Sequence, residues 1–260
     1  MTPLIPGTHN SRDLGGTPLT GGGSVASGVL YRSDALAAVT DAGLEVIASS
    51  PIGTIIDFRT ESERTEAPDR LPAGVPITEH HLSLLEGALP TGAAPTPGEP
   101  VDAEMMRRML ERIPSISQLY IGMLQHAAPA FADVARSIAS PANADRPGVL
   151  VHCTAGKDRT GVATALMLDI AGAERDAVVD DYVQSEQNLS GAWAEAMTAR
   201  VAAMGVPLVP AVTQLLSGTP REAIESAFAW IDERGGSAAY LRSGGLDEDT
   251  IAGLRARLRS

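Results

Sequence analysis

The residue types best able to do chemistry lie in one short stretch of the chain, His152-Cys-Thr-Ala-Gly-Lys-Asp-Arg-Thr-Gly161. Cys153 is followed six residues later by Arg159. A cysteine thiolate is a strong nucleophile, and the planar guanidinium of arginine can bind two oxygens of an oxyanion at once. This pair suits attack of sulfur on a tetrahedral oxyanion such as a phosphoryl group.

The neighbouring sequence predicts how these residues are positioned. An apolar run over residues 148–151 is typical of a buried strand, and residues 162–171 favour a helix that ends at Gly172. A loop that enters a helix N-terminus points several backbone N–H groups inward, and the helix dipole adds positive charge there. We therefore expect Cys153 to attack phosphorus and form a phosphocysteine that water hydrolyses. The expected substrate-binding residues are Thr154, Ala155, Gly156, Lys157 and Thr160.

The leaving oxygen needs a proton, and two aspartates are candidates for the acid. Asp158 lies inside the loop beside Arg159 and is the first choice, whereas Asp57 is the second. Asp158 could instead orient Arg159 or Lys157 by an ion pair without transferring a proton.

Asp57 and Arg59 follow a predicted strand over residues 53–56. In open α/β sheets the ligand crevice lies outside the carboxyl ends of the strands, so both residues could border the same crevice as Cys153. The alternative is a structural salt bridge at the end of the strand. Thr60 and Glu63 then form the sequence pattern of a helix capping box.

The loop resembles the signature of the cysteine-dependent phosphatase superfamily, His-Cys-x5-Arg-Ser/Thr. It is most similar to the bacterial tyrosine-phosphatase-like branch, which has Ala-Gly-Lys-Asp-Arg-Thr-Gly inside the loop. The resemblance extends over nearly the whole chain through four further segments: residues 10–16, 31–34, 56–60 and 235–241. It implies the α/β fold of these phosphatases, a central, mostly parallel sheet flanked by helices, with helical additions.

The resemblance also implies the substrates, which are phosphotyrosine, other phosphoproteins and phosphoinositides. Conventional tyrosine phosphatases carry their acid in a Trp-Pro-Asp loop, and this chain has no such tripeptide. Lipid phosphatases of the superfamily often have basic residues inside the loop. Lys157, the only lysine of the chain, therefore favours a phosphoinositide or a broad substrate range, through binding of a second phosphate at the pocket rim.

Length and composition predict a single domain. The chain has 260 residues, of which 44% are hydrophobic, enough for one well-buried core over residues 1–260. Residues 86–101 are rich in Gly, Ala, Pro and Thr and predict a linker, after which residues 103–112 predict a helix. Together, residues 86–115 could form a tethered lid.

The net charge of −12 weighs against nucleic acid as a partner, because binding a phosphate backbone needs a basic surface. No run of about 18 apolar residues and no leader-like start occur, so we expect no integral membrane segment and a cytoplasmic location, with leaderless export as an open alternative. The expected mechanism needs no metal or other cofactor. The oligomeric state is left open.

Three other readings were weighed. A catalytically inactive phosphate-binding module would normally have lost the cysteine or the arginine, and neither is lost. Thiol redox chemistry lacks a resolving cysteine, because Cys153 is the only one. A nucleotide-binding loop of the Gly-x4-Gly-Lys-Ser/Thr type fails because Val151 replaces the first glycine and Asp158 follows the lysine. The inactive module is the alternative that we keep.

Overall fold

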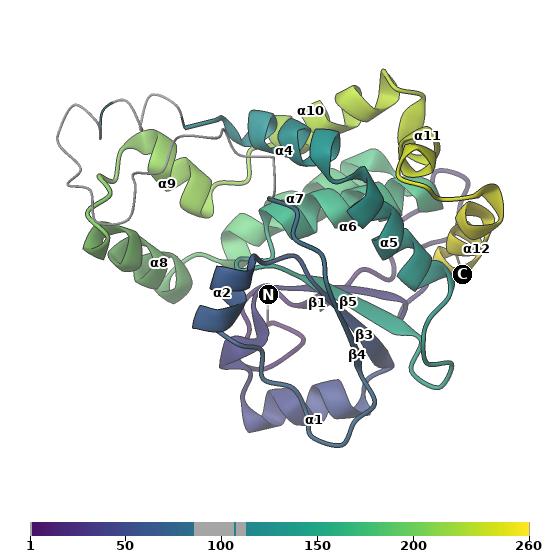
Figure 1. Ribbon diagram of the computed structural model, residues 1–260, viewed down its shortest axis with the longest axis horizontal. Helices are drawn as coiled ribbons and strands as arrows, with labels where there is room; N and C mark the ends of the chain where they lie inside the picture. Colours follow the sequence, from purple (N-terminus) through teal and green to yellow (C-terminus); the bar gives the residue numbers. More distant parts are fainter. Residues whose placement is uncertain (1, 86–106, 108–112, 260) are drawn as a thin grey trace.

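A computed structural model describes residues 2–85, 107 and 113–259 of the chain (Figure 1). Its sheet has the strand order β1-β2-β5-β3-β4, in which β1 is antiparallel to β2 and the other neighbours are parallel. The mostly parallel α/β sheet predicted from the sequence is confirmed. The strands are β1 Arg12–Asp13, β2 Leu30–Ser33, β3 Ile52–Asp57, β4 Thr78–His81 and β5 Gly148–His152.

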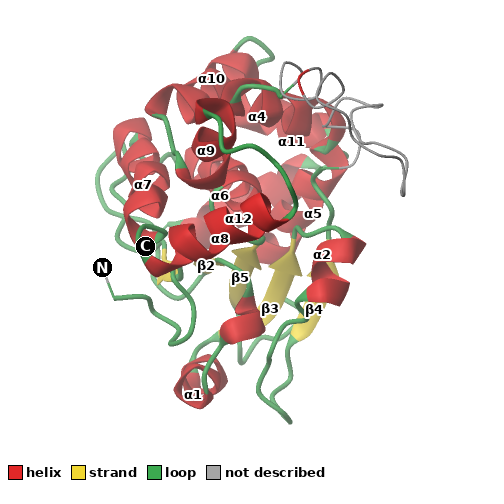
Figure 2. Ribbon diagram, turned by 90° about the vertical axis from the view of Figure 1, so that its left-hand side faces the viewer, coloured by secondary structure: helices red, strands yellow, loops and turns green. Residues whose placement is uncertain are grey.

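Helices cover both faces of this sheet. A short 3-10 helix and α1 lie on one face, and most of the other helices form a thick layer on the opposite face (Figures 1 and 2). The helices are η1 Leu36–Ala38, α1 Asp41–Ser49, α2 Glu61–Glu66, α4 Ile116–His126, α5 Ala128–Ala139, α6 Asp158–Ala171, α7 Arg175–Asn188, α8 Ala192–Ala203, α9 Pro210–Ser217, α10 Arg221–Asp232, α11 Gly236–Ser243 and α12 Glu248–Leu258.

The strand residues alternate between two hydrophobic cores. Leu150 packs into a smaller core with α1, whereas Val149 and Val151 pack into the larger core under the other helices. Ile55 and Ile56 divide between the two cores in the same way. This alternation follows from the twofold repeat of side chains along a strand, and it holds the carboxyl ends of β3 and β5 in a fixed position between two packed layers.

Helix α6 is the central helix of the thick layer. All of its residues except Asp158 and Asp169 are buried, and it contacts α4, α5, α7, α10, α11 and α12. Gly172 ends it in the left-handed conformation, with φ of 81°, as the sequence predicts. A helix packed on all sides holds its N-terminus rigidly, and this N-terminus carries the residues of the predicted site.

Helices α8 and α9 project from this layer. None of the residues of α8 is buried, and Val212 is the buried residue of α9. Within the described residues, Arg200 of α8 pairs with Glu66 of α2, and Lys157 donates to backbone carbonyls at the end of α9.

Two expectations concern parts of the chain that are only partly described. The linker and lid predicted over residues 86–115 fall mainly on residues 86–106 and 108–112, which lie outside the described residues. Within the described part of the chain, no helix is long and apolar enough to cross a membrane.

Candidate active site

The cysteine loop, residues 153–157, joins the carboxyl end of β5 to the N-terminus of α6. Cys153 is 2% exposed, and it follows His152, the last residue of the strand. The loop therefore opens at the edge of the sheet where α/β proteins bind ligands, as the strand–loop–helix pattern predicted.

Carbonyl groups of the cysteine loop face the protein interior, where each has a donor. The carbonyl of Thr154 accepts a hydrogen bond from the backbone N–H of Ala35 at 3.1 Å. Nδ2 of Asn10 donates to the carbonyls of Ala155 and Gly156 at 3.2 and 2.9 Å. Because the C=O and N–H of a trans peptide point in opposite directions, these contacts turn loop N–H groups away from the interior.

Among the described residues, backbone N–H groups of the loop are free to bind a ligand. In residues 2–85, 107 and 113–259, no hydrogen-bond acceptor is found for the backbone N–H of residues 154–157. Backbone N–H groups at a helix N-terminus that lack a protein partner are typical of an anion site. The local geometry therefore agrees with the oxyanion cradle that the sequence predicted.

Two buried arginines support the loop from the protein interior, Arg32 directly and Arg12 through Asn10. Nη2 of Arg32 donates to the carbonyl of Gly156 at 2.7 Å, and Nη1 of Arg32 pairs with Asp181 of α7 at 2.5 Å. Nε of Arg12 pairs with the other carboxylate oxygen of Asp181 at 2.6 Å, and its Nη1 donates to the side chain of Asn10. Asp181 thus pairs with both arginines, one of which binds the loop and the other Asn10.

Gly156 is the one residue of the loop with a positive φ, 62°. A Cβ atom at this position would lie 2.3 Å from the carbonyl oxygen of Ser33. The glycine is required both by its left-handed conformation and by the close approach of β2.

Arg159 is held in place by a carboxylate that the sequence prediction missed. Its Nη1 and Nη2 atoms each donate to Glu63 at 2.7 Å, and Nη1 also donates to the carbonyl of Phe58 at 3.2 Å. Burial lowers the pKa of Arg159, but the hydrogen bonds with Glu63 and the nearby charge of Cys153 raise it by more than burial lowers it. The net shift of the pKa is therefore upward. No described residue accepts a hydrogen bond from Nε, which leaves that N–H for a ligand.

Glu63 does two things at once. Its carboxylate accepts from the backbone N–H of Thr60 at 2.8 Å and closes the predicted capping box of α2. It also accepts from the hydroxyl of Thr154 at 2.5 Å and from both Nη atoms of Arg159. Burial raises its pKa, yet these donors outweigh burial and lower the pKa to about 2. The capping pattern was the available signal, and it indicated only a helix start.

Asp158 is the first residue of α6, and its side chain is 23% exposed. Its Oδ1 accepts a hydrogen bond from the hydroxyl of Tyr120 at 2.8 Å. Its Oδ2 lies 3.5 Å from Nζ of Lys157. The structure therefore places this carboxylate at the N-terminus of α6, directly after the loop, with one oxygen held by a tyrosine.

The Lys157 side chain points into the protein and is completely buried. Nζ donates to the carbonyl of Leu215 at 2.8 Å and to the carbonyl of Gly218 at 3.0 Å. These carbonyls stand at the C-terminus of α9, where the helix dipole favours a cation. The sequence predicted this ammonium at the rim of the pocket, but the end of α9 covers it. A direct contact between Lys157 and substrate stays a prediction.

Thr160 is also buried, and its hydroxyl has no hydrogen-bond partner among the described residues. A buried hydroxyl without a hydrogen-bond partner costs free energy of folding, so its presence calls for an explanation such as a catalytic role or a bound ligand. Its predicted role, a hydrogen bond to the thiolate, remains a prediction that this geometry leaves available.

Asp57 and Arg59 are turned toward each other. Nε and Nη2 of Arg59 donate to the Asp57 carboxylate at 2.8–3.0 Å, and Nη2 also pairs with Asp69 at 2.8 Å. Both are almost fully buried. The arrangement is the structural salt bridge that the sequence left open.

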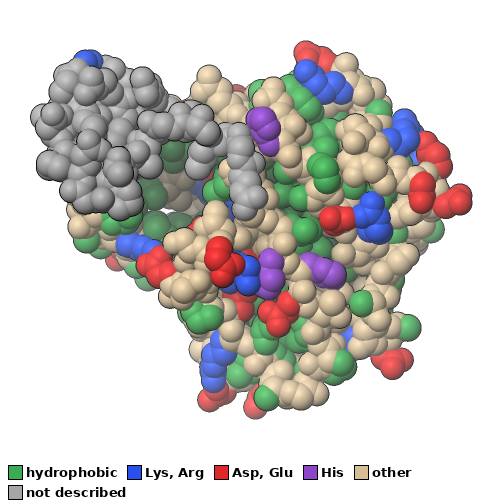
Figure 3. Space-filling model, in the orientation of Figure 1, with side chains coloured by type: hydrophobic (Ala, Val, Ile, Leu, Met, Phe, Trp, Pro, Cys, Tyr) green, Lys and Arg blue, Asp and Glu red, His purple; other side chains and the backbone are tan. Residues whose placement is uncertain are grey.

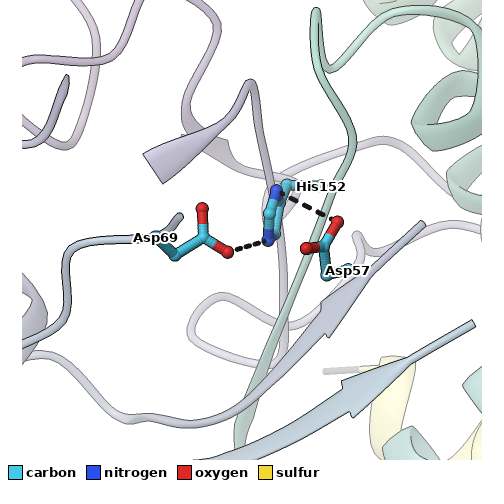
Figure 4. A group of neighbouring side chains, drawn as sticks. All are labelled: Asp57, Asp69 and His152. Carbon is cyan, nitrogen blue, oxygen red and sulfur yellow. Dashed lines mark ion pairs between the residues drawn. The ribbon is translucent and has the colours of Figure 1, made fainter. Parts of the chain in front are cut away.

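His152 lies between the two carboxylates of this cluster (Figure 4). Its Nε2 is 3.2 Å from Asp69 and its Nδ1 is 3.9 Å from Asp57. Burial raises the pKa of Asp69, but His152 and Arg59 lower it below its usual value. Although these three groups are close enough to bind a metal, the guanidinium of Arg59 already pairs with both carboxylates. The cluster anchors the residue before Cys153.

A mostly parallel α/β fold with a cysteine, an anion cradle and an oriented arginine at the carboxyl edge of the sheet is the arrangement of a phosphoryl-transfer hydrolase. The chain belongs to the tyrosine phosphatase family, whose model matches residues 3–260.

Named proteins of other organisms are similar to this chain. It is 31% identical over 253 residues to a protein of Cupriavidus necator named "Putative tyrosine-protein phosphatase", covering 95% of this chain and 84% of that protein. It is 27% identical over 281 residues to the triple specificity protein phosphatase PtpB of Mycobacterium tuberculosis, covering 98% of both chains. A tyrosine-protein phosphatase of Nostoc commune is 30% identical over 169 residues, covering 65% of this chain and 52% of that protein.

Asp181→Asn should destabilise the protein strongly, because it leaves two buried guanidinium groups without their anion. We expect the free energy of unfolding to fall by about 3–5 kcal/mol at pH 7 in urea titrations. Burial raises the pKa of Asp181, but Arg32 and Arg12 lower it below its usual value. Its contribution is therefore present above the ordinary aspartate pKa of about 4 and is lost as the pH falls below it.

The difference between the wild type and Asp181→Asn should accordingly shrink as the pH is lowered. Asp180→Asn on the same helix is the matched control, because Asp180 pairs with Arg221 in solvent, and it should change stability little. Equal effects of the two substitutions would contradict the role given to Asp181.

Proposed function

We propose that the protein is a cysteine-dependent phosphatase that hydrolyses phosphomonoesters, phosphotyrosine first among them, through a phosphocysteine intermediate. The observation that carries the proposal is the cysteine loop, in which Asn10, Arg32 and Ala35 hold the carbonyls inward. The free N–H groups then face the position that a phosphate would take beside Cys153. Family membership supports the same reaction.

In the first step Sγ of Cys153 attacks phosphorus, and the bond between phosphorus and the leaving oxygen breaks. The electron pair of that bond goes to the leaving oxygen, which takes a proton from Asp158. Loop N–H groups and Arg159 bind the equatorial oxygens, where negative charge spreads in the transition state. Because Glu63 holds both Nη atoms of Arg159, the guanidinium is oriented before substrate binds.

In the second step water attacks the phosphocysteine and the sulfur–phosphorus bond breaks. Asp158, now a carboxylate, takes a proton from the water, and the thiolate of Cys153 leaves. Thr160 is the side chain that would stabilise this thiolate, since its buried hydroxyl has no partner among the described residues.

The geometry favours Asp158 over Asp57 as the acid. Asp57 is 1% exposed and is bound by Arg59, whereas the Asp158 side chain is 23% exposed and belongs to the first residue of α6, directly after the loop. A proton donor must reach the leaving oxygen directly or through one water. Asp57 has no such access in this arrangement.

Substrate range is the finer part of the proposal. One relative is named as a triple specificity protein phosphatase, which supports a range wider than phosphotyrosine. Phosphoinositide hydrolysis would need a second cation for a second phosphate, and Lys157 is engaged by two carbonyls and lies near Asp158. Acidic and basic side chains are interspersed on the face drawn in Figure 3. We therefore rank phosphotyrosine above phosphoinositides.

Cys153→Ser should abolish turnover of a phosphotyrosine peptide, a loss of at least about 10³-fold in kcat/KM, because the nucleophile is gone. Binding of tungstate, measured by calorimetry, should persist, since the cradle consists of backbone N–H groups and Arg159. Arg159→Ala should lose both turnover and tungstate binding. Near wild-type turnover by Cys153→Ser would remove Cys153 as nucleophile, and a wild type that binds tungstate without turnover of any phosphomonoester would favour an inactive phosphate-binding module.

Phosphate release from a phosphotyrosine peptide should exceed that from a short-chain phosphoinositide at matched concentrations. Lys157→Ala should reduce kcat/KM for both by similar factors, within about twofold of each other, because the lysine acts through α9 and Asp158. A much larger loss on the phosphoinositide would mean that Lys157 leaves its carbonyl partners and binds the second phosphate itself.

A further inference from the structure

The hydroxyl of Tyr120 is the hydrogen-bond donor to Asp158. Tyr120 belongs to α4, and both the residue and its ring are completely buried. Its hydroxyl also lies 2.8 Å from the hydroxyl of Tyr182, a buried residue of α7. The two rings meet edge to face, with centroids 5.9 Å apart. Three elements distant in sequence, α4, α6 and α7, thus converge on one carboxylate.

The direction of this chain of hydrogen bonds follows from a count of protons. A tyrosine hydroxyl has one proton, and Tyr120 donates its proton to Oδ1 of Asp158. The contact between the two hydroxyls must therefore be a donation from Tyr182 to Tyr120. Burial, the nearby charge of Asp158 and the neighbouring tyrosine all raise the pKa of Tyr120, so Tyr120 stays protonated and remains a donor at neutral pH.

Gly161, the last residue of the loop motif, leaves room for this arrangement. A Cβ atom at position 161 would lie 3.0 Å from Cδ2 of Tyr182, so the ring would have to shift by a few tenths of an ångström. Tyr182 therefore packs closely on the first turn of α6 where that turn carries no side chain. This gives the final glycine of the motif a structural purpose that the sequence alone did not suggest.

Another buried tyrosine shows what a purely structural hydroxyl looks like in this protein. The hydroxyl of Tyr240 donates to the backbone carbonyl of Leu124 at 2.8 Å, and its ring packs edge to face against Trp230. Its partner cannot titrate. The chain through Tyr120 ends instead on a partly exposed carboxylate beside the cysteine loop.

Resting on the proposed function, we propose that Tyr120 and Tyr182 are positioning residues that hold the acid Asp158 through Oδ1, so that Oδ2, which lies 3.5 Å from Nζ of Lys157, is the oxygen that carries the transferred proton. The hydrogen bond from Tyr120 needs a lone pair on Oδ1, which is available both when the carboxylate is ionised and when Oδ2 is protonated. In the first step the Oδ2–H bond breaks as the leaving oxygen gains its proton. In the second step Oδ2 regains a proton from the attacking water.

The test uses leaving groups that differ in their need for a proton. For phenyl phosphate the leaving oxygen needs an acid, whereas 2,4-dinitrophenyl phosphate releases a stable anion without one. Tyr120→Phe should lower kcat/KM for phenyl phosphate by about tenfold, a part of the 10²–10⁴-fold worth of a positioned acid, and should leave 2,4-dinitrophenyl phosphate nearly unchanged. Tyr182→Phe should act in the same direction but less, because Tyr120 still donates to Asp158.

Two controls separate positioning from general damage. Tyr240→Phe removes a buried hydroxyl of the same kind and should leave both rates unchanged. In an Asp158→Asn background Tyr120→Phe should cause no further loss on phenyl phosphate, since the tyrosine acts through the aspartate. Thermal unfolding of each variant shows whether the fold is intact.

Each result points to a different conclusion. A leaving-group-dependent loss in Tyr120→Phe that disappears in the Asp158→Asn background supports the proposal. Two outcomes overturn the role of the tyrosines and leave the proposed function standing. In the first, the loss in Asp158→Asn depends on the leaving group, but Tyr120→Phe has the same rates as the wild type. In the second, Tyr120→Phe loses equally on both substrates. No leaving-group dependence in Asp158→Asn overturns both this inference and the acid assigned under the proposed function, while Cys153→Ser still reports on the nucleophile.

Discussion

The site depends on the hydrogen bonds that hold the carbonyls of the cysteine loop toward the interior. A loop can present several N–H groups to an anion only if the opposite carbonyls find donors, because buried polar groups without partners are costly. Asn10, Arg32 and Ala35 supply these donors. Bringing a guanidinium into the interior in turn requires a buried anion, and Asp181 of α7 supplies it. Hydrogen bonds and ion pairs thus connect the N-terminal arm, β2 and α7 to the loop.

The same carboxylate can satisfy a local and a distant requirement, as Glu63 shows. Within α2 it completes the capping box with Thr60. Across the structure it fixes Arg159 and accepts from Thr154. A guanidinium bound through both Nη atoms loses little freedom when an anion binds, so Arg159 is oriented before any ligand arrives. The charge balance is also local: one anion faces one cation, and the N–H groups of the loop remain for the ligand.

Lys157 and Asp158 are neighbours in the chain that serve different parts of the structure. The lysine connects the loop to the end of α9, which otherwise has little buried surface. The aspartate is held by Tyr120 of α4. The peripheral helices and the central layer therefore meet at the N-terminus of α6. The contacts of α9 and the contact of Tyr120 therefore end on adjacent residues of the chain.

The sequence by itself indicated the candidate chemistry and the elements that position it. The motif with Cys153 and Arg159 indicated the nucleophile and the oxyanion ligand, and hydrophobic runs and helix signals predicted β3, β5, α6 and the capping box at Thr60, because these depend on residues close in the chain. Only the tertiary structure decided the partners. The choice of Glu63 for Arg159, of Arg59 for Asp57, of α9 carbonyls for Lys157 and of Tyr120 for Asp158 depends on how distant segments pack. Charged and polar side chains pair with the groups that packing brings close to them in space. The local sequence does not encode which distant segments will be close.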